Sequence, residues 1–215
     1  MRKSTHKFKY LKTERFFENY DELNESFPKD DDMETRLPKI NNNRYDINLK
    51  YLEERAIGLS SEWIKEVEKF KNIRYFHKLC DELRIDRRAL RTMGRRGQPS
   101  DDDVLYDVQF AYNTKNKTNI KTWLRCPHVD ASNKIIVILV YFPYKDQSYT
   151  FKDHGELLIF DEQNAKTIDK IRYNHNNGII FMNSKIAWHA PISLLNHEDE
   201  HRRFLNVIYM RNNKS

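Results

Sequence analysis

The stretch PHVDASNKIIVILVYFP, residues 127 to 143, joins two polar side chains to the most apolar run of the chain. His128 and Asp130 stand two positions apart, and on an extended segment side chains at this spacing point to the same side. Residues 134 to 142 form a continuous apolar run, which predicts a buried central strand. Polar groups that face inward beside such a strand need partners, because unpaired buried polar groups are costly. A metal ion is one candidate partner.

The rest of the chain predicts short strands after a helical N-terminal part. Residues 106 to 112, YDVQFAY, alternate with a period of two, so that Tyr106, Val108, Phe110 and Tyr112 share one face. A helix is expected to begin at Ser60, with Ser60 or Ser61 as its N-cap, and a shorter one within residues 16 to 28. Further strands are expected at residues 156–160, 170–173, 178–182, 186–189 and 203–210.

Helices followed by a run of short strands predict a mainly β fold (α+β) with N-terminal helices. The architecture we expect is a double-stranded β-helix, or jelly roll, flanked by helices. Residues 1 to 103 would form an N-terminal helical segment that packs on the barrel, and residues 104 to 215 the catalytic core. Together they would make one structural domain.

Composition limits the classes of function. The chain has 215 residues, of which 39% are hydrophobic and 33% charged, which is typical of a globular protein. The net charge of +6 invites a nucleic-acid partner, but basic and acidic residues mostly interleave, and the one basic cluster spans residues 84 to 97. Nucleic acid binding is therefore disfavoured, and a basic binding module for an acidic partner is kept as an alternative.

The chain offers no sign of secretion or membrane insertion. The basic start lacks the apolar stretch of a signal peptide, and no apolar run approaches the ~18 residues of a membrane span. Cys80 and Cys126 are too few for a disulfide framework, so we expect a reducing, cytoplasmic setting.

The search for further metal ligands leads to His189, which directly follows an apolar strand pattern. His128, Asp130 and His189 would provide two imidazoles and one carboxylate, the set associated with non-haem Fe(II) oxygenases. The alternative is a core histidine bonded to a neighbouring carboxylate. Cys126 is either a fourth ligand or, as we favour, a buried thiol. The remaining histidines of this region lie in turn-like or charged stretches: His154, His175, His197 and His201.

An arginine follows on the last predicted strand. Arg202 lies 13 positions after His189 and could bind a carboxylate through its planar fork. Oxygenases of this kind use 2-oxoglutarate, whose distal carboxylate needs such a partner. Tyr141 would donate its hydroxyl to the same carboxylate.

In this order the motifs resemble the prolyl 4-hydroxylase-like branch of the Fe(II)/2-oxoglutarate dioxygenase superfamily, over about residues 104 to 211. The resemblance rests on PHVDASNKIIVILVYFP, GELLIF, IIFMNSKIAWHAPISL and RRFLNVIYM. It implies that His128, Asp130 and His189 are the iron ligands and the catalytic centre. It also implies that Arg202, with Arg203 as the fallback, binds 2-oxoglutarate, in a pocket that further involves Tyr141 and Tyr112. Asn206 shares the face of Arg202 and either contacts the metal-bound species or cosubstrate or has a structural role in the strand, and Leu139 is a further pocket candidate.

Two positions depart from the family pattern. The usual Gly-Gly before the GELLIF strand is His154-Gly155 here. Phe204 stands where a small residue is usual, which predicts either a narrower pocket floor or a register shifted by one residue. Asp130 is present, which disfavours the halogenase variant.

The resemblance further implies Fe(II), the cosubstrates 2-oxoglutarate and O2, and ascorbate as an additional candidate. The expected reaction couples decarboxylation of 2-oxoglutarate to succinate and CO2 with hydroxylation of a peptide, a protein (prolyl-like) or a small molecule. The substrate stays open, although loops at 84–103 and 144–154 would suit a negatively charged or polar one. A cupin-like metal-binding barrel without oxygenase activity is the alternative, and the sequence leaves the oligomeric state undecided.

Overall fold

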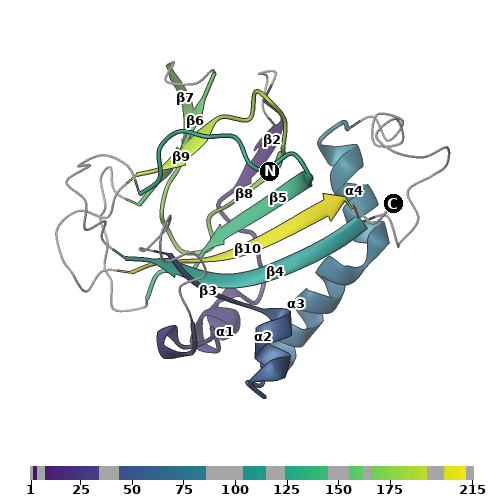
Figure 1. Cartoon of the computed structure of the whole chain (residues 1–215), viewed down its shortest axis with the longest axis vertical. Coiled ribbons are helices and arrows are strands. Elements are labelled where there is room, and N and C mark those ends of the chain that lie inside the picture. The colour runs from purple at the N-terminus through teal and green to yellow at the C-terminus, as the bar shows by residue number, and fades with distance from the viewer. Residues whose placement is uncertain are drawn as a thin grey trace.

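Two antiparallel sheets of unequal size make up the centre of the molecule in a computed structural model (Figure 1). The larger sheet has the strand order β1-β2-β8-β5-β10-β4-β3, and the smaller one the order β7-β6-β9. Together they form a double-stranded β-helix, as the sequence predicts. The structure describes residues 2–3, 8–33, 44–85, 104–114, 124–144, 155–161, 166–192 and 201–211.

The long strands lie in the middle of the larger sheet, where β10 pairs with both β4 and β5. Short strands from the N-terminal part complete its two edges, because β2 pairs with β8 and β3 pairs with β4. The strands are β1 (Arg2–Lys3), β2 (Tyr10–Thr13), β3 (Arg44–Asn48), β4 (Val104–Asn113), β5 (Lys134–Tyr141), β6 (Leu157–Phe160), β7 (Thr167–Ile171), β8 (Gly178–Met182), β9 (His189–Pro191) and β10 (Arg202–Arg211).

Helices cover the face of the larger sheet that points away from the smaller one (Figure 1). The apolar stripe of Trp63, Val67 and Phe70 is fully buried against this face, as expected for core residues at helical spacing. The helices are α1 (Tyr20–Glu25), α2 (Leu49–Glu54), α3 (Ser61–Lys71) and α4 (Ile73–Glu82), with a short 3-10 turn at Asp30–Asp32.

Strand alternation divides the core into two layers. On β10, Leu205, Val207 and Tyr209 pack on the helices, whereas Phe204 and Ile208 face the space between the sheets. The other central strands alternate in the same way. Side chains on the inner face of β10 therefore point toward the smaller sheet, and this is where a site can form.

Most predicted elements are confirmed, with shifts at the ends of short strands. Ser60 is the N-cap of α3 and accepts a hydrogen bond from the backbone N–H of Trp63 at 3.3 Å. The strand expected at 186–189 was placed too early, since β9 begins at His189, and the one expected at 170–173 was placed too late. The N-terminal strands β2 and β3 and helix α2 were not predicted.

Several predicted segments lie outside the described residues. These are most of the basic cluster at 84–97, nearly all of the loops at 84–103 and 144–154, and His154 and His197. Among the described residues, no helix has the length and apolar character needed to cross a membrane.

Candidate functional site

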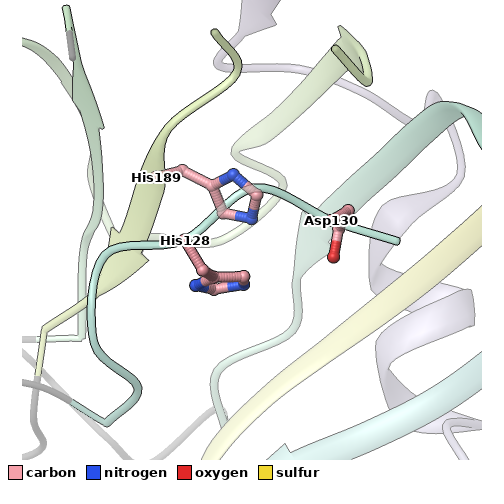
Figure 2. A group of neighbouring side chains, drawn as sticks. All are labelled: His128, Asp130 and His189. Carbon is pink, nitrogen blue, oxygen red and sulfur yellow. The ribbon is translucent and has the colours of Figure 1, made fainter. Parts of the chain in front are cut away.

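Three side chains that the sequence singles out meet between the two sheets. His128 and Asp130 lie in the segment that leads into β5, and His189 is the first residue of β9 (Figure 2). Their nitrogen and oxygen atoms that could bind a metal all lie within 4.8 Å of one another. His189 is buried, whereas His128 and Asp130 are partly exposed at residue level. The three therefore form a pocket-facing donor set with two nitrogens and one carboxylate.

Backbone pairing fixes the two imidazoles relative to each other. His128 and His189 form an isolated antiparallel bridge, in which each backbone N–H donates to the other carbonyl at 3.0 Å. The ring centroids are 4.5 Å apart. A one-residue slip of the segment before β5 would break this pairing and turn His128 away from the site.

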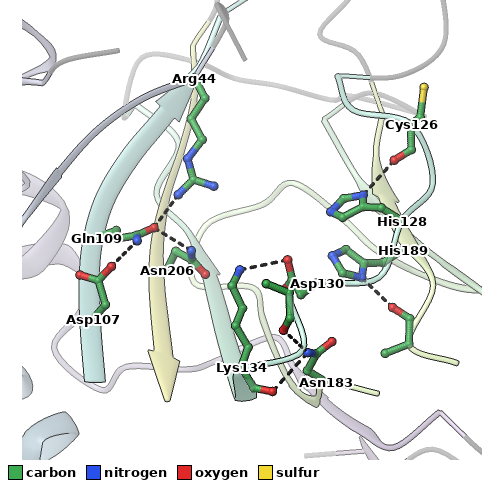
Figure 3. Close-up of polar contacts among 12 residues, drawn as sticks. Arg44, Asp107, Gln109, Cys126, His128, Asp130, Lys134, Asn183, His189 and Asn206 are labelled. Carbon is green, nitrogen blue, oxygen red and sulfur yellow. Dashed lines mark hydrogen bonds and ion pairs between the residues drawn. The ribbon is translucent and has the colours of Figure 1, made fainter. Parts of the chain in front are cut away.

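The hydrogen bonds of the two rings settle which nitrogen can bind a metal. Nδ1 of His128 lies 2.8 Å from the carbonyl oxygen of Cys126, and Nδ1 of His189 lies 2.9 Å from that of Ala187 (Figure 3). A carbonyl oxygen only accepts, so each Nδ1 carries the hydrogen and donates it. In the neutral rings, each Nε2 then keeps a lone pair, which is the usual arrangement of metal-binding histidines.

The surroundings keep both rings neutral. Burial, together with the neighbouring His189 and Arg125, lowers the pKa of His128 to about 4. Burial likewise lowers the pKa of His189, although Asp130 opposes this change. Neutral imidazoles can bind a metal without first losing a proton.

Asp130 is held in place by its own segment. Its Oδ1 accepts a hydrogen bond from the Lys134 ammonium at 3.0 Å (Figure 3). Burial raises the pKa of Asp130, but the charge and hydrogen bond of Lys134, with a contribution from the two imidazoles, outweigh burial, and the net pKa is lowered. Asn183 fixes the intervening turn by donating to the carbonyls of Ala131 and Lys134 at 2.8 and 3.2 Å.

A cavity of about 90 Å³ adjoins the three candidate ligands. Apolar side chains from both sheets form much of its wall, and among the described residues four cations and one carboxylate, Asp130, line it. The lining residues are Arg44, Asn113, Leu124, Arg125, His128, Asp130, Lys134, Val137, Leu139, Leu157, Phe181, His189, Pro191, Arg202, Phe204 and Asn206.

Arg202 lines this cavity and is almost completely buried, with 2% of its surface exposed. Its guanidinium donates from Nε to the carbonyl of Gly155 at 2.7 Å, from Nη1 to Oδ1 of Asn113 at 3.2 Å, and from Nη2 to the Tyr141 hydroxyl at 2.6 Å. All three acceptors are neutral, and no carboxylate among the described residues pairs with Arg202. One N–H on each terminal nitrogen is left over, enough to hold one carboxylate.

Arg203 points to the opposite side of the sheet. It donates to the carbonyl of Phe142 at 2.9 Å and to Oδ1 of Asn24 at 2.6 Å, and it stacks on the rings of Phe27 and Tyr144. Arg203 therefore belongs to the layer between the larger sheet and the helices, and only Arg202 reaches the cavity.

The other predicted pocket residues divide into three groups. Leu139 and Asn206 line the cavity from paired positions on β5 and β10. Tyr141 does not line it but lies behind Arg202, where its buried hydroxyl accepts a hydrogen bond. Tyr112 is wrong as a pocket residue, because it lies on the other face of β4 and stacks on Tyr45 and His201 at 4.8 and 4.4 Å.

Two further expectations are corrected. Cys126 is exposed, not a buried thiol, and it contributes its carbonyl to His128 without joining the cluster of candidate ligands. His201 is not a solvated loop residue, since its ring stacks on Tyr112 and its Nδ1 pairs with Asp30.

Sequence reasoning missed several polar residues of the cavity. Asn113 follows Tyr112 on β4, so the alternation of that strand could have placed it opposite Arg202. Arg44 belongs to the unpredicted strand β3 and donates to Oε1 of Gln109 at 2.7 Å (Figure 3). Gln109 in turn accepts from Nδ2 of Asn206 at 2.9 Å. This polar chain joins β3, β4 and β10 beside the cavity.

Comparison with known proteins identifies the fold. No protein-family model and no curated protein matches the sequence. Among solved structures, a prolyl-4-hydroxylase of Pseudomonas putida superposes with a TM-score of 0.56 at 12% identity, covering 94% of this chain and 92% of that one. This chain has the fold of the 2-oxoglutarate-Fe(II) oxygenases. The dioxygenase for auxin oxidation 1 of Arabidopsis thaliana, solved as a complex with 2-oxoglutarate, gives 0.53 at 10% identity, covering 91% and 79%.

Proposed function

We propose that the protein is a non-haem Fe(II)- and 2-oxoglutarate-dependent dioxygenase that hydroxylates its substrate. His128 and His189 would bind Fe(II) through Nε2, and Asp130 through its carboxylate. The donor set fits this metal, because two imidazoles and one carboxylate on one side leave the other positions open. The chemistry expected of bound Fe(II), with 2-oxoglutarate and O2, is oxidative decarboxylation to succinate and CO2 coupled with hydroxylation of a substrate carbon.

The residues of the chain position the reactants. Arg202 would hold the distal carboxylate of 2-oxoglutarate, with Tyr141 behind it to orient the guanidinium. Leu139 and Phe204 would exclude water from this end of the cavity, since both line it with apolar surface. Lys134 would keep the Asp130 carboxylate charged and oriented toward the metal.

The observation that carries this proposal is the buried charge of Arg202. An arginine that is 2% exposed and bonded only to neutral acceptors lacks a counter-charge, and a buried unpaired charge is costly. A dicarboxylate in the cavity would supply that charge. A cupin-like metal barrel without oxygenase activity would have no need for this arginine.

The test compares Arg202→Lys with Arg203→Lys. Each substitution replaces a buried arginine with lysine, which keeps the positive charge and removes the planar guanidinium that can bind a carboxylate through two hydrogen bonds. Binding of 2-oxoglutarate is measured by calorimetry under nitrogen on the Fe(II)-loaded proteins, with thermal unfolding to confirm that both variants fold. We expect Arg202→Lys to weaken binding by about tenfold or more, and Arg203→Lys to leave it within about twofold. Equal losses, or no binding to the unmodified protein, would contradict the proposal.

The alternative of a basic binding module rests on the cluster at 84–97, most of which lies outside the described residues. No observation on the described residues favours it over the oxygenase.

A further inference from the structure

The cavity carries more positive charge than an oxygenase needs for its cosubstrate. Within the described part of the chain, its lining includes four cations, Arg44, Arg125, Lys134 and Arg202, against the single carboxylate of Asp130. In the proposed function, the bound 2-oxoglutarate places its distal carboxylate on one of these, Arg202. The partners of the other three cations decide whether any charge remains for a second ligand.

Two of the remaining cations have a carboxylate partner within the protein. Lys134 pairs with Asp130 at 3.0 Å, and Arg44 pairs through Nε with Oδ2 of Asp46 at 3.1 Å. Arg125 has no hydrogen-bond acceptor or ion-pair partner among the described residues. It is therefore the one lining cation for which neither the described protein nor the cosubstrate supplies an anion.

Backbone hydrogen bonds hold the segment that carries Arg125 beside the metal ligands, and the Arg125 side chain itself is exposed. Leu124 donates its N–H to the carbonyl of Pro191 at 3.0 Å, and His128 pairs with His189 three residues after Arg125. Both ends of this short segment are thus attached to β9.

A second arginine lines the same cavity from the other sheet. Arg44 comes from β3 at the edge of the larger sheet, and Figure 3 shows it on the opposite side from His128. Its guanidinium is fixed by Gln109 at 2.7 Å and lies 5.2 Å from the ring centre of Phe204. Because Asp46 neutralises its charge and Gln109 fixes its position, Arg44 forms a fixed wall of the cavity opposite the metal ligands.

We propose that the primary substrate carries a carboxylate, which Arg125 binds at the cavity entrance. The proposal rests on the proposed function, since it assigns Arg202 to 2-oxoglutarate. The planar fork of an arginine binds a carboxylate through two parallel hydrogen bonds, which fixes the orientation of the substrate as well as its position. A carboxylate held beside His128 would direct one neighbouring C–H bond of the substrate toward the metal.

The experiment uses protein loaded with Fe(II) and saturating 2-oxoglutarate under nitrogen, so that Arg202 is already occupied. Calorimetry then measures binding of two matched pairs: L-glutamate against L-glutamine, and a capped pentapeptide with a central glutamate against the same peptide with glutamine. We expect at least one of the two acids to bind about tenfold or more tightly than its amide. This is the gain in affinity expected from one hydrogen bond to a charged group. The free acid and the peptide distinguish a small-molecule substrate from a protein side chain.

Variants test whether Arg125 is the residue that distinguishes the acid from its amide. Arg125→Gln should remove the preference for the acid, and Arg125→Lys should retain part of this preference. Arg74→Gln, which removes an exposed arginine on α4 away from the cavity, is the matched control and should behave as the unmodified protein. Equal binding of acid and amide, no binding of any of the four probes, or a preference that survives Arg125→Gln would overturn the inference. Failure of 2-oxoglutarate to bind before any probe is added would instead overturn the proposed function.

Discussion

His128 and His189 face each other across a single antiparallel bridge, with both backbone hydrogen bonds at 3.0 Å and both Nδ1 atoms bonded to a carbonyl two residues earlier in the chain. Two segments 61 positions apart in sequence therefore present their Nε2 atoms in the same local geometry. The backbone sets the tautomer of both rings, so the site is organised before any metal arrives.

Lys134 is expected to tune metal affinity through Asp130. Lys134→Met removes the ammonium that lies 3.0 Å from Oδ1, which frees the carboxylate to rotate. We expect the affinity for Fe(II) to fall by about 10- to 100-fold, as is common when a partner of a metal ligand is lost. Anaerobic Fe(II) titration measures this, with Lys65→Met on the exposed face of α3 as control. Unchanged affinity in Lys134→Met would show that Asp130 needs no support from this side chain.

Gly155 connects the backbone to the arginine site. It has a φ of +72°, and an added Cβ would lie 3.1 Å from the Cβ of Tyr173. We expect Gly155→Ala to lower the free energy of unfolding by about 1–2 kcal/mol. It should also weaken 2-oxoglutarate binding, because the Gly155 carbonyl accepts from Arg202 at 2.7 Å. Gly58→Ala, where an added Cβ meets nothing within 4 Å, is the matched control for both urea unfolding and calorimetry.

Asp169 joins the two sheets and should make stability depend on pH. On β7 it accepts from the Tyr10 hydroxyl at 2.8 Å and from the Lys12 ammonium at 2.7 Å, both on β2. Burial raises the pKa of Asp169, but these hydrogen bonds outweigh burial and the net pKa lies below its usual value of 3.8. A carboxyl with a lowered pKa in the folded state stabilises the protein above pH 3.8 and loses this contribution as the pH falls through the folded value.

The corresponding variant is Asp169→Asn, which we expect to lower the free energy of unfolding by about 1 kcal/mol at pH 7. The difference from the unmodified protein should shrink as the pH falls below 3.8, as measured by urea unfolding at several pH values. A difference that is constant across this range would rule out an ionic contribution.

Removing the N-cap of α3 tests how much this cap contributes to the stability of the protein. Ser60→Ala removes the acceptor for the backbone N–H of Trp63, and we expect a loss of about 1 kcal/mol in the free energy of unfolding. Ser61→Ala, whose hydroxyl bonds only to the exposed Glu62 side chain, should cost less. Equal losses would mean that the cap contributes nothing beyond side-chain propensity.

The sequence predicted elements whose signals are local. The apolar run that becomes β5 and the capped helix α3 carry their pattern within a few residues. Strand β3, RYDIN, has no such pattern, because it gains stability only by pairing with β4. Arg44 was missed for this reason, since its place beside the cavity depends on that distant pairing.

Prediction of the candidate site from the sequence was limited in the same way, because it also depended on contacts between distant segments. Alternation along β4 put Tyr112 on the face of Val108 and Phe110, which the structure confirms, and that face points to the helices. The resemblance nevertheless suggested Tyr112 for the pocket, and the local alternation was the better guide. Which face of a strand meets the cavity depends on the packing of two sheets, and the pattern of one strand does not contain it.

The central claim is that Fe(II) and 2-oxoglutarate bind together at His128, Asp130, His189 and Arg202. The most direct measurement is an anaerobic titration of Fe(II) into the purified protein with 2-oxoglutarate, following the visible charge-transfer band of the chelated complex, alongside His189→Ala and Arg202→Lys. We predict a band that requires both Fe(II) and 2-oxoglutarate, is absent in His189→Ala and needs more 2-oxoglutarate in Arg202→Lys. A folded protein that gives no band, or a band that persists in His189→Ala, would contradict the account.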